Sequence, residues 1–386
     1  MALHFERREF VERMARARAA LREADLAALL IFAQESHYYL TGFDSAGFVF
    51  FQCAILTADD QPITLLTRRP DLEQARRTSI IEDIRIWYDL EGADPARDLK
   101  AILDEKGLQG SRVGIELNTF GLTGFNHERV RRQLDGWCEL IDSSDLIREL
   151  RVTKSPAELA YVRKAAALAD DALVAMVATA RPGAFEGNIA AAGAKVILEG
   201  GGDPPPSGPV LGSGDRALLV RSATGYRHLS AVDQLTLEFA ASYRYYCACL
   251  MRTVAIGQPD PRQRGMYEAT RDALAAMTEA VRPGRSLGEI DEAHRRVFDD
   301  AGFRTSRLGA CGYSLGATFR PSWMDVPPMI YLGNPTPARP GMVLFLHAIL
   351  IDSLHNLAMS LGHTIVVTGQ GCEVLSGLAP EYRVCV

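Results

Sequence analysis

The sequence lacks a long hydrophobic run and an apolar leader at its start. The longest wholly apolar run, residues 26–33, is far shorter than the roughly 18 residues that a transmembrane helix needs. Charged residues begin at position 6, so the apolar core of a signal peptide is missing. We therefore expect a cytoplasmic protein without a membrane partner.

The cysteines show no regular spacing, and the chain has no excess of basic residues. The seven cysteines are odd in number and irregularly spaced, which favours free thiols in a reducing compartment. A net charge of -6 and a pI near 5.8 provide no positive field for a phosphate backbone. These features exclude a nucleic-acid partner and favour a soluble enzyme.

The first part of the chain alternates between helical and strand-like patterns. Apolar residues recur at helical spacing through Phe10, Met14 and Leu21, and residues 26–32 form a buried-strand pattern. Further strands are expected at 47–56, 62–67, 84–88 and 113–116, with helices at 71–78 and at 95–106, capped by Asp94. Residues 1–152 are therefore predicted to form one α/β domain.

A domain boundary follows. Ser155 can cap a helix whose first position suits Pro156 and whose first turn suits Glu158. We place the second domain at residues 153–386.

The second domain contains an internal repeat at an offset of 101 residues. Residues 171–190 and 272–291 share ten identities in twenty gap-free positions. Each copy predicts a helix, an Arg-Pro-Gly turn and a second helix, followed by strands. Two aligned Arg-Pro-Gly turns are not explained by a general likeness among alanine-rich helices, so a duplicated unit with a pseudo-twofold axis is expected.

Glu238 is a carboxylate within an otherwise apolar strand pattern, residues 235–246. Burial raises the pKa of such a group unless it has a partner, which suits a nucleophile or a general acid or base. A structural ion pair with Arg244 or Arg252 is the alternative.

Several segments together resemble one known fold. Residues 235–257, the turn 312–316, the strand start 341–343 and the strand 364–368 resemble, in order and spacing, the signature segments of the pita-bread fold of creatinase, prolidase and aminopeptidase P. The resemblance covers nearly the whole chain. It implies an α/β (α+β) protein with a creatinase-like N-terminal domain and a duplicated pita-bread catalytic domain.

Metal-dependent members of this superfamily bind two ions with two Asp, one His and two Glu. The matching positions here are Glu238, Cys249, Tyr313, His347 and Gly362. That set does not supply the usual ligands, so no metal and no other cofactor is expected. A single zinc held by Glu238, Cys249 and His347 remains an alternative.

The sequence is more similar to the metal-independent branch that contains creatinase and ectoine hydrolase, above all around 41–44, 238–240 and 243–247 and at Gly312-Tyr313. The resemblance implies hydrolysis of a C–N bond in a small amidine or amide, with Glu238 as the nucleophile. The branch has a catalytic His seventeen residues before this Glu, whereas this chain has Arg221, which cannot act as a base. His228 is a nearby substitute, and Arg221 could instead bind a substrate carboxylate.

Other side chains complete the expected site. His347 is the first choice for general acid or base, with a core histidine as the alternative, and Tyr313 is expected to donate to developing charge. The even spacing of His347, His355 and His363 is interpreted as a hairpin coincidence, with His355 in the turn. Candidate substrate-binding residues are Trp323 and Asp325 in the irregular loop 317–335, and Arg221, Tyr243, His228 and Cys249.

The expected partner is a small-molecule substrate. The resemblance also implies a homodimer, with the apolar segment 48–51 as the place to look for the contact. Two alternatives remain, which are an Xaa-Pro metallopeptidase with an atypical site and a catalytically inactive binding protein.

Overall fold

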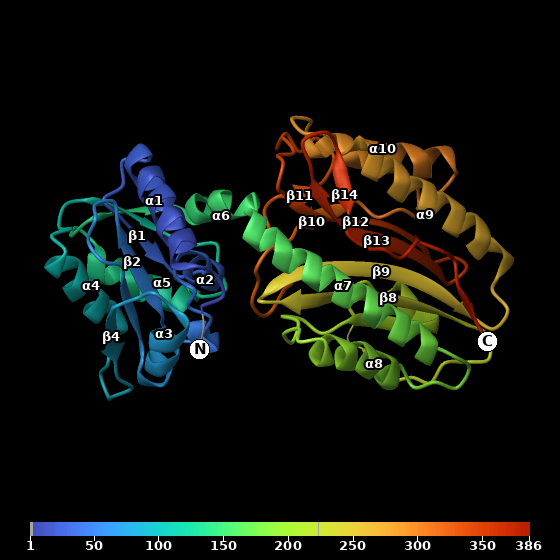
Figure 1. Ribbon diagram of the computed structural model, residues 1–386, viewed down its shortest axis with the longest axis horizontal. Coiled ribbons are helices and arrows are strands. Elements are labelled where there is room, and N and C mark those ends of the chain that lie inside the picture. The colour runs from blue at the N-terminus through green and yellow to red at the C-terminus, as the bar shows by residue number, and fades with distance from the viewer. Residues whose placement is uncertain (1–2, 223) are drawn as a thin grey trace. The chain divides into compact units, whose positions relative to one another are not determined.

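The computed structural model describes residues 3–222 and 224–386, and the chain divides into two compact units, Met1–Arg151 and Val152–Val386 (Figure 1). No helix in the described part of the chain is both long and apolar enough to cross a membrane. Each unit has its own sheet and its own hydrophobic core.

The first unit is a six-stranded sheet with the order β4-β3-β2-β1-β5-β6. The pairs β1–β2 and β2–β3 are antiparallel, and the other three pairs are parallel. The strands are β1 (Ala28–Ile31), β2 (Cys53–Thr57), β3 (Thr64–Arg68), β4 (Asp83–Trp87), β5 (Arg112–Ile115) and β6 (Glu139–Asp142). The helices are α1 (Arg7–Glu23), α2 (Gln34–Thr41), α3 (Leu72–Thr78), α4 (Pro95–Glu105), α5 (Gly124–Leu134) and α6 (Ser144–Val152).

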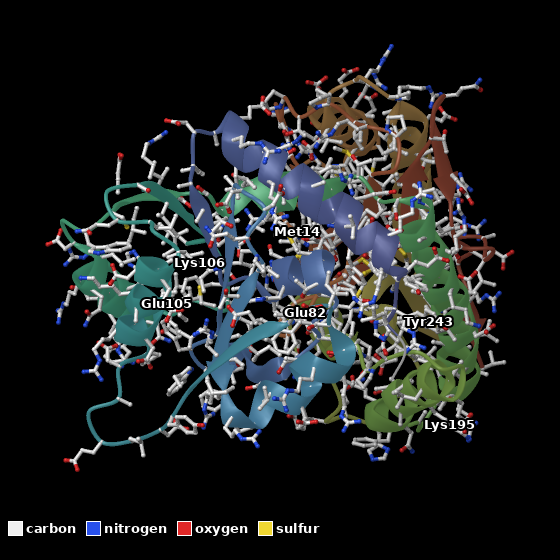
Figure 2. All side chains as sticks on the ribbon, turned by 60° about the vertical axis from the view of Figure 1, so that its left-hand side comes forward. Met14, Glu82, Glu105, Lys106, Lys195 and Tyr243 are labelled. Atoms are coloured by element: carbon white, nitrogen blue, oxygen red, sulfur yellow. The ribbon has the colours of Figure 1, made fainter. Side chains whose placement is uncertain are left out.

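Each face of this sheet packs against its own buried apolar cluster, and successive residues of β1 point into the two clusters in turn. Ala28 and Leu30 belong to one buried cluster, and Leu29 and Ile31 belong to the other. Met14 of α1 joins the second cluster, while charged side chains such as Glu105 of α4 are exposed (Figure 2). The α/β pattern of the first unit is thereby confirmed.

The prediction of a strand at 47–56 is wrong for the first half of that range. A 3-10 helix occupies Ala46–Val49, because the Ser45 side chain accepts a hydrogen bond from the Gly47 amide and caps the turn. The strand begins only at Cys53. Helix α2 was not expected, because its eight residues are almost all buried and show no one-sided apolar pattern.

The second unit is a nine-stranded sheet whose main path is β11-β10-β12-β13-β9-β8-β7. Two short strands lie off this path, since β14 pairs with β13 and β15 pairs with β9. The strands are β7 (Val210–Ser213), β8 (Asp233–Tyr243), β9 (Tyr246–Ile256), β10 (Gly312–Ser314), β11 (Met329–Ile330), β12 (Val343–Asp352), β13 (Leu357–Val367), β14 (Cys372–Val374) and β15 (Val384–Cys385).

Four helices cover one face of this sheet. Helix α7 (Pro156–Thr179) packs on β8 and β9, and α9 (Pro261–Ala280) packs on β12 and β13 (Figure 1). Helix α8 (Glu186–Glu199) lies against α7 and the edge strand β7, and α10 (Leu287–Asp300) lies against α9 and the edge strand β11. The predicted start of α7 is confirmed, because Ser155 and Glu158 form a reciprocal capping box. Lys195 points outward from α8 (Figure 2).

The two Arg-Pro-Gly turns have the same geometry, as the duplication predicts. Gly183 and Gly284 have φ angles of 79° and 83°. Each glycine amide donates a 2.8 Å hydrogen bond across to a later segment, to the carbonyl of Leu229 in one copy and of Ala338 in the other. The turn that ends the first helix of each copy is therefore held in the left-handed conformation that favours glycine.

We predict that Gly183→Ala and Gly284→Ala each lower the free energy of unfolding by about 1 kcal/mol, because an L residue is strained at positive φ. A Cβ at either position meets nothing within 4 Å, so the backbone alone sets the cost. Gly265→Ala, at an open position within α9, is the control and should be stabilising by up to about 1 kcal/mol. Urea denaturation measures all three, and clearly unequal losses at the two turns would contradict an equivalent duplication.

Candidate active site

The sheet face opposite the helices carries the candidate site. Leu235, Leu237 and Phe239 of β8 pack in the core beneath α7 and α8. Successive strand residues point to opposite faces, so Glu238 points away from these helices. The duplication thus leaves one face of the second sheet free for chemistry.

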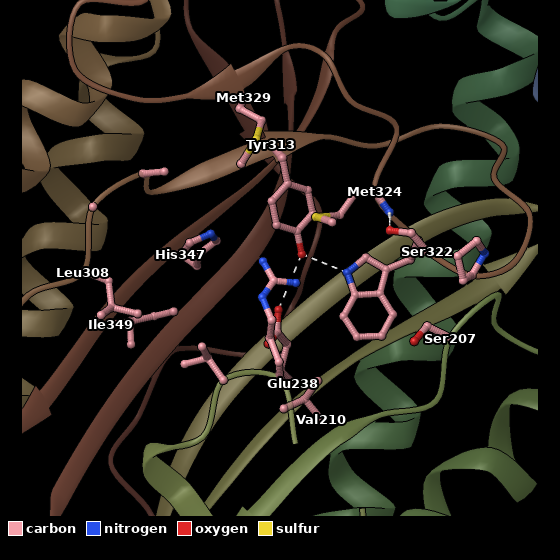
Figure 3. A pocket seen from close by; sticks show the side chains of 16 residues that line it. Ser207, Val210, Glu238, Leu308, Tyr313, Ser322, Met324, Met329, His347 and Ile349 are labelled. Atoms are coloured by element: carbon pink, nitrogen blue, oxygen red, sulfur yellow. Dashed lines mark hydrogen bonds between the residues drawn. The ribbon is translucent and has the colours of Figure 1, made fainter. Parts of the chain in front are cut away.

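A cavity of about 400 Å³ lies on this face (Figure 3). Its walls come from both halves of the duplicated unit and from the loops beside them. The lining residues are Ser207, Val210, Val220, Arg221, Glu238, Leu308, Gly309, Ala310, Tyr313, Pro321, Ser322, Trp323, Met324, Met329, His347 and Ile349. Among the described residues, Glu238 is the only acidic side chain in this lining.

Glu238 is linked to the second half of the duplicated unit by a hydrogen bond from Tyr313. The Tyr313 hydroxyl donates to Glu238 Oε1 at 3.5 Å and accepts from Trp323 Nε1 at 2.8 Å (Figure 3). Trp323 thereby directs the tyrosine proton toward the carboxylate. The structure brings together three of the residues that the sequence pointed to.

Burial raises the pKa of Glu238 to about 7, against the lowering effects of the Tyr313 hydrogen bond and the Arg221 charge. Burial also raises the pKa of the Tyr313 hydroxyl well above its usual value. Glu238 is therefore partly ionised near neutral pH, and Tyr313 keeps its proton. A carboxylate that changes state near neutrality suits a nucleophile or a general base.

His347 lies on β12 and contributes to the cavity wall (Figure 3). Burial lowers its pKa to about 3, with a smaller effect from His294. The imidazole is therefore neutral at physiological pH, and the same burial disfavours the imidazolium that would form if it kept a proton. A neutral imidazole has one N–H donor and one acceptor nitrogen, so it suits a proton relay, and the acid or base role that the sequence left open stays a prediction.

Arg221 is exposed at the cavity rim, with its positive charge close enough to lower the pKa of Glu238. The ion pairs proposed as an alternative for Glu238 do not form in the described part of the chain. Arg252 instead donates to the backbone carbonyls of Met251 and Gly362. Glu238 is thus left facing the cavity.

Four of the expected substrate-binding residues lie outside this lining. Tyr243 is on the helix side of β8, with its ring 5.8 Å from that of Tyr161 in α7. His228 is near the first Arg-Pro-Gly turn, where Nδ1 donates to the Gly183 carbonyl at 3.1 Å. Asp325, within the loop 317–335, is buried, and its amide donates to the Ser314 carbonyl at 2.9 Å.

Cys249 is the fourth of these residues. It lies on the same sheet face as Glu238, fully buried, with its amide bonded to Thr364 Oγ1 at 2.8 Å. Burial raises the pKa of its thiol well above the usual value, and the nearby Glu238 adds to the rise. Cys249 therefore supports the floor beneath the cavity as a neutral thiol.

The three evenly spaced histidines do not converge. His355 is in the hairpin turn and bonds Asp352 Oδ2 at 2.7 Å. His363 is on the helix face, 3.1 Å from Thr278 Oγ1 of α9. Only His347 of the three lines the cavity, so the hairpin interpretation is confirmed.

The sequence did not reveal the apolar part of the lining. Leu308 lies in the loop before β10, Met324 in the loop before β11, Met329 at the start of β11 and Ile349 within β12. Such residues follow no periodic pattern, and only the assembled sheet places them together. They make the cavity a largely apolar pocket with few polar groups, as is usual for small-molecule sites.

A creatinase-like unit joined to a duplicated pita-bread unit with a pocket on its sheet defines a class of hydrolases. Residues 13–153 match the Creatinase/Prolidase N-terminal domain, and residues 160–369 match metallopeptidase family M24. The chain therefore belongs to metallopeptidase family M24.

Individual relatives agree with this assignment over the full length. An uncharacterized hydrolase/peptidase of Sinorhizobium fredii is 27% identical over 98% of both chains, and an ectoine hydrolase of Halomonas elongata is 24% identical over 97% of both. The dipeptidase PepE of Mycobacterium ulcerans superposes with a TM-score of 0.84 at 25% identity, covering 98% of this chain and 99% of its own. A prolidase of Thermococcus sibiricus reaches 0.88 at 19% identity over 97% and 99%. The pita-bread prediction is confirmed.

The residues present do not fit the two-ion centre of metal-dependent relatives. A Cβ at Gly362 would lie 2.7 Å from Phe345 Cζ, so an aromatic ring occupies the place of a ligand side chain. The Tyr313 hydroxyl is engaged by Trp323. In the described ranges no group of three metal-ligating side chains includes Glu238, Cys249 or His347.

We predict that Glu238→Gln stabilises the protein increasingly as the pH rises. The folded state raises the Glu238 pKa from 4.5 to about 7, so it binds the proton more tightly than the unfolded state does. The wild type therefore loses up to about 3 kcal/mol between pH 4.5 and pH 7, and Gln removes this loss. Urea denaturation at pH 5 and pH 8 measures it. An equal difference between the two proteins at both pH values would contradict the raised pKa.

Proposed function

We propose that the protein is a metal-independent hydrolase of a C–N bond in a small amidine or amide solute, with Glu238 as the nucleophile and ectoine as the leading specific substrate. The observation that carries this proposal is the buried Glu238 carboxylate, held by Tyr313 at the base of a pocket that lacks the family's metal ligands. The full-length relationship to an ectoine hydrolase supports it.

The charges of the pocket favour a zwitterionic substrate. Arg221 offers a guanidinium at the rim, and Glu238 offers a carboxylate at the base. An amidinium would be attracted to Glu238, while a carboxylate on the same molecule would pair with Arg221. The flat face of Trp323 and the thioethers of Met324 and Met329 would pack against the ring of such a solute.

In the proposed first step a Glu238 oxygen forms a bond to the amidine carbon. The electron pair of the C=N bond moves to its nitrogen, which is already protonated in an amidinium and becomes a neutral amine. Tyr313, which stays protonated, donates a hydrogen bond to charge that develops beside it. The result is a covalent Glu238–substrate intermediate.

In the second step water releases the intermediate. Neutral His347 relays a proton from the water to the leaving nitrogen as the C–N bond breaks and the other nitrogen re-forms a C=N bond to the former amidine carbon. The water oxygen then bonds to this carbon, and collapse expels the Glu238 carboxylate while the hydroxyl proton goes to solvent. The product carries a new amide oxygen and a free amine.

We further propose that the protein acts as a homodimer through the exposed part of the 48–51 segment. Val49 is 66% exposed and Phe50 is 47% exposed, with the Arg68 guanidinium 3.9 Å from the Phe50 ring centre. Exposed apolar side chains of this size favour a protein contact.

Glu238→Gln should lower turnover of ectoine, or of the best amidine in a panel with creatine and Xaa-Pro dipeptides, by about 10³-fold or more, because the amide is a poor nucleophile. Wild-type turnover should persist in the presence of a chelator. Product formation measured by chromatography checks both. Dipeptide cleavage that is abolished by chelator and restored by zinc or manganese would overturn the proposal in favour of a metallopeptidase.

The pH profile should report Glu238 directly. The nucleophile must be ionised, so kcat/KM should fall as the pH drops below about 7. Tyr313→Phe removes a hydrogen bond that lowers this pKa, so the acidic limb should move to higher pH while kcat falls about 10²-fold. A limb that stays in place in Tyr313→Phe would rule out Glu238 as the titrating group.

Val49→Asp should shift the dimer toward monomer because it places a charge in an apolar contact. Val11→Asp is the matched control, since Val11 is 63% exposed on α1 of the same unit. Sedimentation velocity separates the two states. If both variants keep the wild-type mass, the contact lies elsewhere.

A further inference from the structure

Three side chains of metal-ligating type converge outside the pocket. Asp291 and His294 lie on α10, and Cys311 precedes β10. One ligand atom of each lies within 4.8 Å of the others, and all three residues are buried. In the described ranges this is the one such group of Asp, His and Cys.

Two atoms of this group have no hydrogen-bond partner. Asp291 Oδ1 and His294 Nδ1 lie 3.9 Å apart, in residues that are 0% and 1% exposed. This separation is too long for a hydrogen bond, but it is near the roughly 3.4 Å between two light-atom ligands of one tetrahedral zinc ion. Buried polar atoms without partners are rare in native proteins, and each calls for an explanation such as a bound water molecule or ion.

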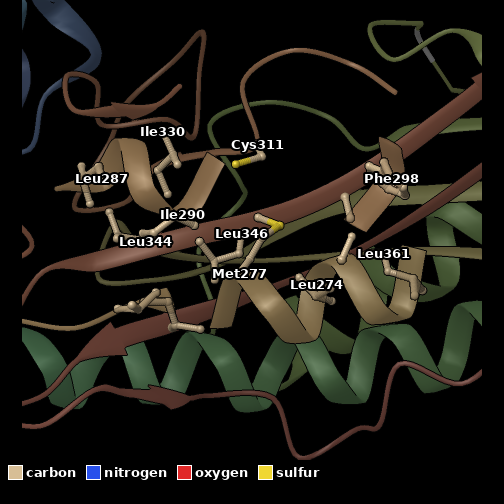
Figure 4. Close-up of a cluster of buried hydrophobic side chains, with 14 of the residues drawn as sticks. Leu274, Met277, Leu287, Ile290, Phe298, Cys311, Ile330, Leu344, Leu346 and Leu361 are labelled. Atoms are coloured by element: carbon tan, nitrogen blue, oxygen red, sulfur yellow. The ribbon is translucent and has the colours of Figure 1, made fainter. Parts of the chain in front are cut away.

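The backbone fixes the position of each group. Asp291 and His294 are three residues apart and therefore lie on one face of α10. The Cys311 amide donates to the Ile330 carbonyl at 2.9 Å, and the Cys311 carbonyl accepts from the His347 amide at 2.9 Å. Figure 4 shows Cys311 beside Ile330, near the helix that carries Ile290. Such preorganised side chains suit a metal site.

The surrounding charges are mixed, because Asp291 and Asp299 raise the pKa of His294 whereas Arg307 and Arg295 lower it. The guanidinium of Arg295 bonds Asp291 Oδ2 and leaves Oδ1 free to act as a ligand. Burial raises the pKa of the Cys311 thiol and lowers that of His294 to about 4, so without metal both side chains are neutral. On binding, the Cys311 thiol would lose its proton to solvent, and the thiolate and the Asp291 carboxylate would balance a divalent ion.

We propose that Asp291, His294 and Cys311 bind one zinc ion, with a water molecule as the fourth ligand. Oxygen, imidazole nitrogen and thiolate are all zinc ligands, whereas magnesium and calcium prefer oxygen alone. The site is distinct from the Glu238 pocket, yet residues 308–310, directly before Cys311, line that pocket. Zinc would anchor the loop that forms this wall.

The test uses the full chain, stripped with chelator and titrated with zinc or cobalt. Wild type should bind stoichiometric zinc, gain thermal stability with it, and show a thiolate-to-cobalt charge-transfer band. Cys311→Ser should abolish that band, and both Cys311→Ser and His294→Gln should weaken zinc binding about 100-fold or more. Cys372→Ser is the matched control, because Cys372 lies outside both sites, and it should behave like wild type.

Glu238→Gln separates this site from the pocket and should keep its zinc. Absence of zinc binding by folded, stripped wild type would overturn the proposal, and so would binding that is unchanged in both Cys311→Ser and His294→Gln. Zinc lost with Glu238→Gln would place the ion in the pocket and overturn it as well. His294→Gln keeps the test decisive if Cys311→Ser does not fold.

Discussion

The hydrogen bond between Tyr313 and Glu238 joins the two halves of the duplicated unit at its functional face. Glu238 comes from β8 and Tyr313 from β10, which lie on opposite sides of the central strands β9, β12 and β13. A carboxylate buried on an apolar strand destabilises the fold when it is charged, and the tyrosine hydroxyl offsets only part of that cost. The other features of the pocket are arranged around this pair.

The second sheet can accommodate this buried carboxylate because the apolar packing of helices on its other face stabilises the fold. Four helices pack on that face with a large apolar cluster, and the Arg-Pro-Gly turns fix each helix pair in the same way. A rigid strand positions a side chain more closely than a loop does. The loops then supply Arg221, Trp323 and the methionines, which can vary without disturbing the core.

Much of this arrangement could be predicted where local rules decide. Ser155 and Glu158 mark a helix start whatever the tertiary structure, and the repeated turns mark the duplication. The alternation along β8 also separates Glu238 from Tyr243, which are five positions apart and so face opposite sides. That parity places Tyr243 on the helix side of the sheet, although the sequence analysis expected it among the substrate-binding residues.

Long-range contacts could not be predicted in this way. The pairing of Asp291 and His294 with Cys311 depends on where α10 meets the start of β10, and no spacing in the sequence fixes that meeting point. His228 and Arg221 differ for the same reason, since only the folded loop decides which of them reaches the pocket. Local sequence patterns therefore predict helices and strands, whereas the residues that meet in a site are known only from the packing of the folded chain.

Apolar packing determines the electrostatics of the pocket. The rings of Tyr313, Phe345 and His347 lie 5.4 to 5.7 Å apart, and Phe345 fills the space in front of Gly362. This packing removes water, which is the main cause of the raised pKa of Glu238 and the lowered pKa of His347. A side chain at position 362 would fit only if Phe345 also moved. The two positions therefore constrain each other, and a single substitution at position 362 would not supply a metal ligand at this place.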